Sequence, residues 1–285
     1  MFTSTNKLID LIPYFKKKLG VLYSDREVDN LFYWVCEDQF ELQKFQVKMG
    51  DKRLTESELL TVRTIVKRLE QKEPIQYILG TTEFYNCKIK VDENTLIPRP
   101  ETEELVDWVL DNVSKEQAVL DIGTGSGCIP IALKKAIDSL TVSGLDISAK
   151  AIAMAKESAE LNDVKVDFIQ MDILNPDLEG LKMYDVIISN PPYVLESDKS
   201  QMNENVLSYE PHLALFVADH EPLLFYIAIA KIGLTQLNPG GLLFFEIHEN
   251  FGKETIEMLE KLGYQNIELR EDMQGKDRMI RCCRG

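Results

Sequence analysis

The feature that most constrains this chain is the regular alternation of strand and helix patterns that begins near residue 118. Short apolar runs, typical of buried parallel strands, are separated by longer segments with apolar residues at helical spacing. Such alternation predicts a doubly wound, mostly parallel sheet with helices on both faces. Two late segments, 266–270 and 278–282, are close enough to form a hairpin. The other expected strands are 118–122, 141–147, 164–170, 184–189 and 241–247, and the expected helices are 129–137, 149–161, 221–237 and 253–262.

A glycine-rich turn follows the first expected strand, in the sequence Asp121-Ile122-Gly123-Thr124-Gly125-Ser126-Gly127. Glycines let the backbone turn tightly and approach a ligand closely, with the amino terminus of the next helix behind it. Such turns occur in dinucleotide, nucleotide and S-adenosylmethionine sites, so the turn alone does not choose among them.

Acidic residues stand at the ends of successive strands. Asp146 ends the second strand, where its carboxylate can accept hydrogen bonds from both hydroxyls of a ribose. Asp172 follows the third strand, where we expect an adenine edge. One such residue alone is more often a strand-end cap than a ligand. Together with Asp121 they stand in register beside the glycine turn, which favours a ligand that contains a nucleoside.

The fourth strand ends in Asn190-Pro191-Pro192-Tyr193. Consecutive prolines end a strand, because neither donates to a sheet ladder and both have a fixed φ. The resulting rigid loop offers an amide oxygen, free carbonyls and a flat aromatic face, which suit a planar NH2 group. An NAD dehydrogenase would need a hydride-accepting site with an acid or base here. By itself the segment would be a strand-ending turn, but in this context it indicates chemistry on a planar amine.

The amino-terminal third has a helical pattern. Two capping boxes, Ser24 with Glu27 and Thr55 with Glu58, each precede apolar residues at helical spacing. Pro13 is expected to interrupt or bend an earlier helix. We therefore expect a small helical bundle with an aromatic core formed by Phe32, Trp34, Phe40 and Phe45.

The segment between the bundle and the alternating region has a different pattern. Two short strands are expected around an Asn86-Cys87 turn. Arg99 then stands between two prolines that fix its backbone, which suits either a plain connector or the edge of a site. The expected division is a helical domain over 1–80, a hairpin linker over 81–100 and a catalytic domain over 101–285.

Composition narrows the class of substrate. The formal net charge is −15, and the only basic cluster is Lys16-Lys17-Lys18, so a polyanionic substrate is disfavoured. Five scattered cysteines and three histidines have no disulfide or metal-ligand spacing. No apolar run reaches membrane-spanning length and no apolar signal region stands at the amino terminus. We expect a reduced cytoplasmic protein, monomeric by default, with neither a metal ion nor a membrane partner.

The glycine turn, Asp146, Asp172 and the Asn-Pro-Pro-Tyr segment together resemble class I S-adenosylmethionine-dependent methyltransferases that act on planar amino groups. Three further segments narrow this resemblance: 73–80, 96–103, and Tyr209-Glu210-Pro211 with Ala214-Leu215. With them the chain resembles, over nearly its whole length, the bacterial peptide chain release factor glutamine methyltransferases of the HemK type.

This resemblance implies an α/β fold of the class I methyltransferase (Rossmann-like) type, with a small amino-terminal helical domain for substrate recognition joined by a β-hairpin. It implies S-adenosylmethionine as cofactor and class 1 release factors as protein substrates, methylated on the glutamine N5 of a Gly-Gly-Gln motif, with no direct nucleic-acid substrate. The implied catalytic residues are Asn190, Pro191 and Tyr193, and Pro192, Arg99 and Glu101 join them in binding substrate. The implied cofactor-binding residues are Asp121, Gly123, Thr124, Gly125, Ser126, Gly127, Asp146, Ile147, Asp172, Ile173 and Asn190.

The chain departs from the family pattern at two places. Ile173 stands where relatives often carry an aromatic residue, which predicts weaker stacking on adenine. The segment 245–250 lacks a glycine and a glutamine that relatives commonly carry. Two alternatives to the family function are an adenine-N6 methyltransferase of nucleic acid, which uses the same four-residue segment on a flipped base, and a catalytically inactive cofactor-binding regulatory protein.

Overall fold

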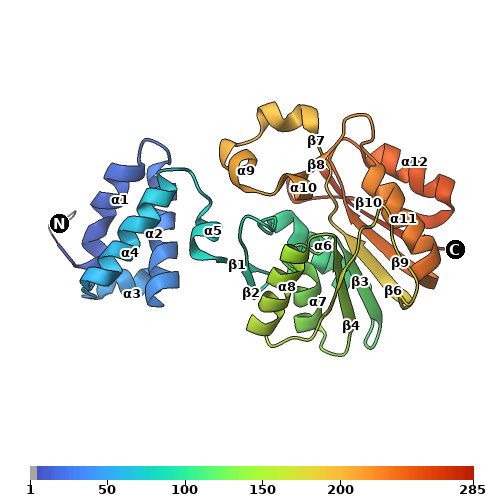
Figure 1. Ribbon diagram of the computed structural model, residues 1–285, viewed down its shortest axis with the longest axis horizontal. Coiled ribbons are helices and arrows are strands. Elements are labelled where there is room, and N and C mark those ends of the chain that lie inside the picture. The colour runs from blue at the N-terminus through green and yellow to red at the C-terminus, as the bar shows by residue number, and fades with distance from the viewer. Residues whose placement is uncertain (1–4) are drawn as a thin grey trace. The chain divides into compact units, whose positions relative to one another are not determined.

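The computed structural model describes residues 5–285, which form two compact units (Figure 1). The helical unit contains the described residues up to Gly80 together with Glu204–Tyr209. The sheet unit contains Thr81–Asn203 and Glu210–Gly285. The hairpin expected as a linker thus lies within the sheet unit, and a short late segment that the expected division placed in the catalytic domain lies within the helical unit.

The helical unit is built around one apolar core, to which Leu11, Phe15, Phe32 and Val66 contribute fully or almost fully buried side chains. Pro13 lies in the first turn of α1, directly after the 3₁₀ turn η1, where its missing N–H costs no hydrogen bond. The elements of the unit are η1 (Leu8–Leu11), α1 (Ile12–Leu19), α2 (Asp25–Phe40), α3 (Lys44–Met49), α4 (Glu56–Leu69), α5 (Ile75–Leu79) and α9 (Glu204–Tyr209).

Both predicted capping boxes are confirmed. The Ser24 side chain accepts from the backbone amide of Glu27, whose carboxylate accepts from the amide of Ser24 at 2.8 Å. Thr55 and Glu58 make the same reciprocal pair at the start of α4. These pairs satisfy amides that the first turn of a helix leaves without partners, so they fix where α2 and α4 begin.

The prediction of an all-aromatic core is wrong for two of its four members. Phe32 is buried, whereas Trp34 is 48% exposed and Phe45 is 65% exposed. Trp34 follows Phe32 by two helical positions, a rotation of about 200° that turns it away from the buried face of α2. Phe40 is partly buried against the core.

The sheet unit contains a seven-stranded sheet in the order β10-β11-β9-β6-β3-β4-β5. The strands from β9 to β5 are parallel, and β11 and β10 add to β9 as an antiparallel edge. The predicted late hairpin is therefore confirmed. The seven strands are β3 (Ala118–Ile122), β4 (Thr141–Asp146), β5 (Asp167–Gln170), β6 (Tyr184–Ser189), β9 (Leu237–Glu246), β10 (Tyr264–Glu271) and β11 (Asp277–Arg284).

Helices cover both faces of this sheet, as two successive residues of β9 show. Phe244 packs edge-on against Trp108 of α6 at 5.4 Å between ring centroids, and Phe245 packs edge-on against Tyr226 of α11 at 5.3 Å. Neighbouring strand residues point to opposite faces, so α6 and α11 lie on opposite sides. The longer helices of the unit are α6 (Pro100–Leu110), α7 (Cys128–Ala136), α8 (Ala149–Leu161), α11 (Leu224–Gln236) and α12 (Gly252–Leu262).

The remaining elements are short. The first hairpin turns at Tyr85 and Asn86, both with positive φ, one residue earlier than predicted. Strand β5 begins at Asp167 rather than at the expected 164. The short elements are β1 (Thr81–Phe84), β2 (Cys87–Lys90), β7 (Val194–Leu195), η2 (Glu196–Gln201), α10 (His212–Leu215) and β8 (Phe216–Val217).

Candidate active site

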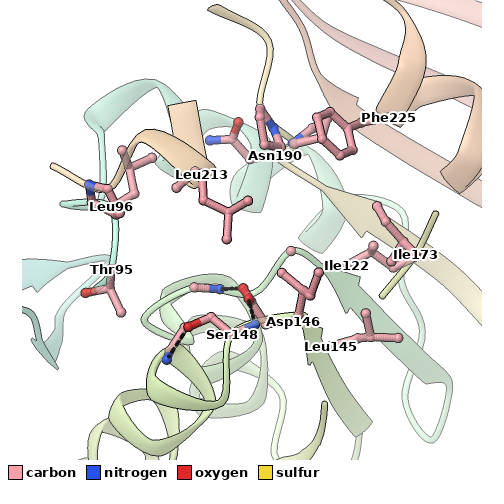
Figure 2. A pocket seen from close by; sticks show the side chains of 18 of the residues that line it. Thr95, Leu96, Ile122, Leu145, Asp146, Ser148, Ile173, Asn190, Leu213 and Phe225 are labelled. Carbon is pink, nitrogen blue, oxygen red and sulfur yellow. Dashed lines mark hydrogen bonds between the residues drawn. The ribbon is translucent and has the colours of Figure 1, made fainter. Parts of the chain in front are cut away.

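A cavity of about 370 Å³ lies at the carboxyl ends of the parallel strands (Figure 2). In the sheet β3 is flanked by β4 on one side and β6 on the other, so the order of the strands reverses at β3. Ligands of open α/β sheets bind at this kind of switch point. The volume falls within the usual range of about 300–1,000 Å³ for small-molecule sites.

The glycine turn forms one wall of the cavity. Gly123, Gly125 and Gly127 all have positive φ, at 77°, 51° and 80°, a conformation that side chains disfavour. A Cβ atom at Gly127 would lie 3.0 Å from the Cβ of Ala155, because α7 and α8 pack closely there. Gly123 and Gly125 line the cavity, and Gly127 is the cap residue before α7.

Asp146, at the end of β4, holds this turn in place. Its Oδ2 accepts a hydrogen bond of 2.8 Å from the Gly125 amide, and its Oδ1 accepts one of 2.9 Å from the Ser148 amide (Figure 2). Burial raises the pKa of this carboxyl, and the amides of Ser148 and Gly125 oppose the rise. Each carboxylate oxygen keeps a second lone pair, so Asp146 can also accept hydrogen bonds from a ligand at the cavity wall.

Asn190 follows β6 and enters a buried network of side chains. Its Nδ2 donates to the Thr102 hydroxyl at 3.2 Å. Thr102 donates in turn to Oε2 of Glu246 at 2.7 Å, and Tyr193 donates to Oε1 of Glu246 at 2.9 Å. Thr102 is 3% exposed and Glu246 is 1% exposed. Burial raises the pKa of Glu246, and the Thr102 and Tyr193 hydroxyls oppose that rise because they stabilise the charged form.

Curated relatives with similar sequences share one description. The chain is 43% identical over 273 residues to the release factor glutamine methyltransferase of Flavobacterium psychrophilum, which covers 94% of this chain and 95% of the relative. It is 41% identical over 272 residues to the release factor glutamine methyltransferase of Bacteroides thetaiotaomicron, covering 95% of this chain and 98% of the relative. The chain belongs to the release factor glutamine methyltransferase family.

Two family profiles agree with this membership, and a solved structure shares the fold. The profile described as the PrmC N-terminal domain matches residues 33–80, and the Methyltransferase small domain profile matches residues 101–209. The crystal structure of a methyltransferase from Pyrococcus furiosus has a TM-score of 0.54 and 16% identity to this chain, covering 81% of this chain and 100% of that one. The likeness to that structure confirms the predicted methyltransferase fold.

Members of this family are methyltransferases, and the cavity fits S-adenosylmethionine as the cofactor. The turn around Gly123 and Gly125 carries no side chain that would block the approach of a ligand to the backbone. Asp146 supplies an acceptor for ribose hydroxyls, and apolar side chains supply most of the remaining wall. Of the residues predicted to bind cofactor or substrate, those that line the cavity are Gly123, Gly125, Asp146, Ile147, Asp172, Ile173, Asn190, Pro191 and Pro192.

Four residues of the predicted cofactor set belong to the end of β3 and the glycine turn but do not line the cavity. Among the described residues that line the cavity, Asp121, Thr124, Ser126 and Gly127 do not occur. Asp121 is fully buried, because it points to the opposite face of β3 from Ile122, which does line the cavity. Burial raises the pKa of Asp121 to about 7, opposed by the Thr124 hydroxyl and reinforced by the charge of Asp146. Contact of these four with the cofactor stays a prediction.

An aromatic side chain that the sequence analysis missed lies near Ile173. Phe225, from the first turn of α11, lines the same side of the cavity as Ile173 (Figure 2). It offers the aromatic surface that Ile173 lacks. Asp172 lines the cavity too, but its oxygens accept from the Leu174 amide at 2.9 Å and from Asn175 at 3.0 Å, so it also caps its own loop. No local pattern singled out Phe225, because α11 is largely apolar, with Lys231, Thr235 and Gln236 in its second half as its charged or amide- and hydroxyl-bearing residues beside Tyr226.

Tyr193 makes contacts that the sequence did not suggest. Its hydroxyl donates to Glu246, its ring packs edge-on against His248 at 6.1 Å, and it does not occur among the described lining residues. Burial and the nearby Glu246 charge raise the pKa of Tyr193 well above its usual value. Packing of this ring on the substrate amide stays a prediction.

Arg99 and Glu101 do not occur among the described lining residues either. Arg99 forms an ion pair of 2.6 Å with Glu210, whose second oxygen accepts from the Ile97 amide at 3.3 Å. This pair holds the segment before α6, and Pro100 is the first residue of that helix. Glu101 accepts a hydrogen bond of 3.3 Å from Gln274. Their role in substrate binding stays a prediction.

Two further segments of the cavity wall were not predicted from the sequence. One is the segment 93–96 after the first hairpin, including Thr95 and Leu96 (Figure 2). The other carries Pro211, Leu213 and Ala214, and Leu213 is 62% exposed although it is apolar. The segments that carried the family resemblance include Leu96 and Ala214, so that resemblance was the one available signal for both segments.

Residues 5–285 contain neither a candidate metal site nor a candidate membrane-spanning helix. Within that range no group of three or more His, Cys, Asp or Glu side chains could hold a metal ion. None of the helices described there is both long enough and apolar enough to cross a membrane.

Proposed function

We propose that this chain transfers a methyl group from S-adenosylmethionine to the side-chain amide nitrogen of the glutamine in the Gly-Gly-Gln motif of class 1 peptide chain release factors. The observation that carries the proposal is the Asn190 amide at the cavity wall, held by Thr102 and followed by two prolines. The family to which the chain belongs supports the same reaction, since its curated relatives are described as release factor glutamine methyltransferases.

The reaction has one main obstacle. The nitrogen of a carboxamide is a poor nucleophile, because its lone pair is delocalised into the carbonyl group. When bound, S-adenosylmethionine supplies an electrophilic methyl group. The protein must therefore turn the lone pair of the amide nitrogen towards that methyl group and stabilise the positive charge that develops on nitrogen.

Asn190 and the proline loop supply the required acceptors. The Asn190 Oδ1 and the carbonyl of Pro191 accept the two N–H hydrogens of the glutamine and so orient its amide plane. The loop lies next to the cofactor wall, since a Cβ atom at Gly123 would be 4.0 Å from the Asn190 carbonyl oxygen. On transfer, the bond between the methyl carbon and the sulfonium sulfur would break, the sulfur would keep the electron pair and leave as the thioether S-adenosylhomocysteine, and the methylated nitrogen would lose one proton to solvent. This chemistry requires acceptors in place rather than a strong base.

The substrate is tested by transfer of a labelled methyl group. The chain is incubated with labelled S-adenosylmethionine and either a release factor, the same factor with its Gly-Gly-Gln glutamine changed to alanine, or duplex and single-stranded nucleic acid. We expect label on the unchanged factor alone. Label on nucleic acid would favour adenine-N6 methylation, and binding of cofactor without any transfer would favour a regulatory protein.

The charge of the chain argues against the nucleic-acid alternative. A net charge of −15 opposes binding of a polyanion, because such binding depends on neutralising phosphates. A release factor presents its glutamine on a protein surface, which does not need a basic stripe.

The setting of the reaction is also part of the proposal. We place the activity in the cytoplasm, with the chain as a monomer and the helical unit as the part that recognises the release factor. All five cysteines are free thiols in the described structure, which supports a reducing compartment. Light scattering tests the oligomeric state, and cross-linking of the factor to the helical unit followed by peptide mapping tests the recognition role. A dimer, or the absence of cross-links within the helical unit, would contradict these two statements.

A further inference from the structure

Glu246 and Thr102 form a buried pair with no assigned function. Glu246 ends β9 and Thr102 lies in the first turn of α6, 144 positions apart in the chain. The Glu246 carboxylate accepts from Thr102 at 2.7 Å and from Tyr193 at 2.9 Å. Glu246 thereby connects Thr102, which contacts Asn190, with Tyr193, and so it links the two ends of the segment 190–193. Burying a carboxylate costs free energy. A buried carboxylate beside this segment therefore indicates that Glu246 has a function there.

The direction of these hydrogen bonds has a consequence for Asn190. A hydroxyl group has one hydrogen, and Thr102 gives it to Glu246. The remaining contact of the Thr102 oxygen, with the Asn190 side chain at 3.2 Å, must then be one in which the hydroxyl accepts. Only the NH2 end of the amide can donate to it, so the Oδ1 end is turned the other way.

We infer that Glu246 is a positioning residue that orients the Asn190 amide through Thr102. The carboxylate sets the direction of the hydroxyl, and the hydroxyl sets the direction of the amide. This inference rests on the proposed function, because the orientation matters where Asn190 Oδ1 must accept an N–H from the substrate. If the Asn190 amide were turned by 180°, its NH2 group would face the N–H of the substrate, and two donors cannot form a hydrogen bond.

Variants at Thr102 separate the effect of the hydroxyl group on methyl transfer from the effect of side-chain packing. Thr102→Val keeps the shape and removes the hydroxyl, so we expect kcat for methyl transfer to fall about 3- to 10-fold with the dissociation constant for S-adenosylmethionine unchanged. Thr102→Ser keeps the hydroxyl and should recover most of that loss. Glu246→Gln places an NH2 group in the network and can reverse the Thr102 hydroxyl, so we expect a fall of about 10- to 100-fold. Equal losses in the Val and Ser variants would overturn the inference.

A double-mutant cycle tests whether Thr102 acts through Asn190. In an Asn190→Ala background there is no amide to orient, so adding Thr102→Val should cause no further loss of kcat. If the two losses multiply instead, Thr102 acts by another route and the inference is wrong. A merely structural role of Thr102 would lower the melting temperature without this non-additivity.

A spectroscopic measurement keeps the inference independent of turnover. With selective ¹⁵N-asparagine labelling, the Asn190 side-chain NH2 signals are assigned by their loss in Asn190→Ala. We expect these signals to move in Thr102→Val and to stay close to the wild-type position in Thr102→Ser. If the wild-type chain methylates no release factor, the proposed function fails while these signals still test the orientation. Unmoved signals in Thr102→Val would overturn the inference alone.

Discussion

The Gly125 amide donates a hydrogen bond of 2.8 Å to the Asp146 carboxylate, which ties the turn after β3 to the end of β4. The same carboxylate lines the cavity, and we propose that it accepts hydrogen bonds from the ribose of the cofactor. On this proposal, replacing Asp146 should affect cofactor binding more than a change at other strand ends.

Replacing Asp146 by asparagine should weaken binding of S-adenosylmethionine about 10- to 100-fold, because hydrogen bonds to a charged group are lost from one side of the carboxylate. Isothermal titration calorimetry measures the dissociation constant. Asp167→Asn is the matched control, since Asp167 starts the next strand, its side chain is 59% exposed and it lies outside the described cavity wall. Equal affinities of the Asp146 variant and wild type would contradict the role given to this carboxylate.

Alanine at Gly127 should cost more stability than alanine at Gly240. Both residues have positive φ, at 80° and 78°, so each substitution carries a backbone cost of about 1–2 kcal/mol. At Gly240 no atom lies within 4 Å of the added Cβ, whereas at Gly127 the Cβ of Ala155 lies at 3.0 Å. This overpacking adds about 1–3 kcal/mol. Urea unfolding of both variants measures the difference, and equal losses would show that the turn and α8 do not pack as described.

Asp121 should make the stability of the chain fall as pH rises through the weakly acidic range. Its pKa is about 7 in the folded protein against an ordinary value of 3.8, chiefly because of burial. The folded state therefore holds a proton that the unfolded state has lost between about pH 4 and pH 7, and folding becomes less favourable across that window. The full effect is at most about 4 kcal/mol.

Asp121→Asn tests this pH dependence. The variant should lose less stability than wild type between pH 4 and pH 7, measured by urea unfolding in the absence of cofactor. Asp138→Asn, with a fully exposed side chain, serves as the control and should follow the wild-type curve. Parallel curves for Asp121→Asn and wild type would show that this carboxyl titrates alike in both states.

Phe225 should contribute to cofactor affinity through its ring. Phe225→Leu keeps an apolar side chain at the cavity wall and removes the aromatic face, so we expect the dissociation constant for S-adenosylmethionine to rise about 2- to 10-fold. Phe251→Leu is the matched control, because Phe251 lies outside the described lining residues and contacts the His248 ring instead. An unchanged constant in Phe225→Leu would show that the ring does not contact the bound adenine.

Local features of this fold could be read from the sequence, and long-range ones could not. The capping pair of Ser24 and Glu27 involves residues three positions apart, so its geometry follows from the sequence spacing alone. The alternating strands and the hairpin of β10 and β11 followed from apolar patterning. Trp34 was predicted to be buried because it is aromatic, but its position on α2 places it outside the buried face, where it is 48% exposed.

The partners of the site residues were beyond sequence reasoning. Thr102 and Glu246 are 144 positions apart, and Arg99 and Glu210 are 111 apart. No spacing rule links residues at such distances, because their meeting depends on how α6 packs against the sheet. The sequence thus indicated candidate residues such as Asn190, which lines the cavity, while the structure was needed to find the side chains that hold them in place.

The most direct test of the account is methyl transfer by Asn190→Ala compared with wild type, with a release factor as substrate. Removing a preorganised acceptor costs about 100- to 1,000-fold in rate, so kcat should fall by that amount. Binding of S-adenosylmethionine, measured on the same preparations by calorimetry, should change less than about threefold, because one wall residue among many is shortened. A variant that methylates the factor at close to the wild-type rate would contradict the central claim that Asn190 orients the substrate amide.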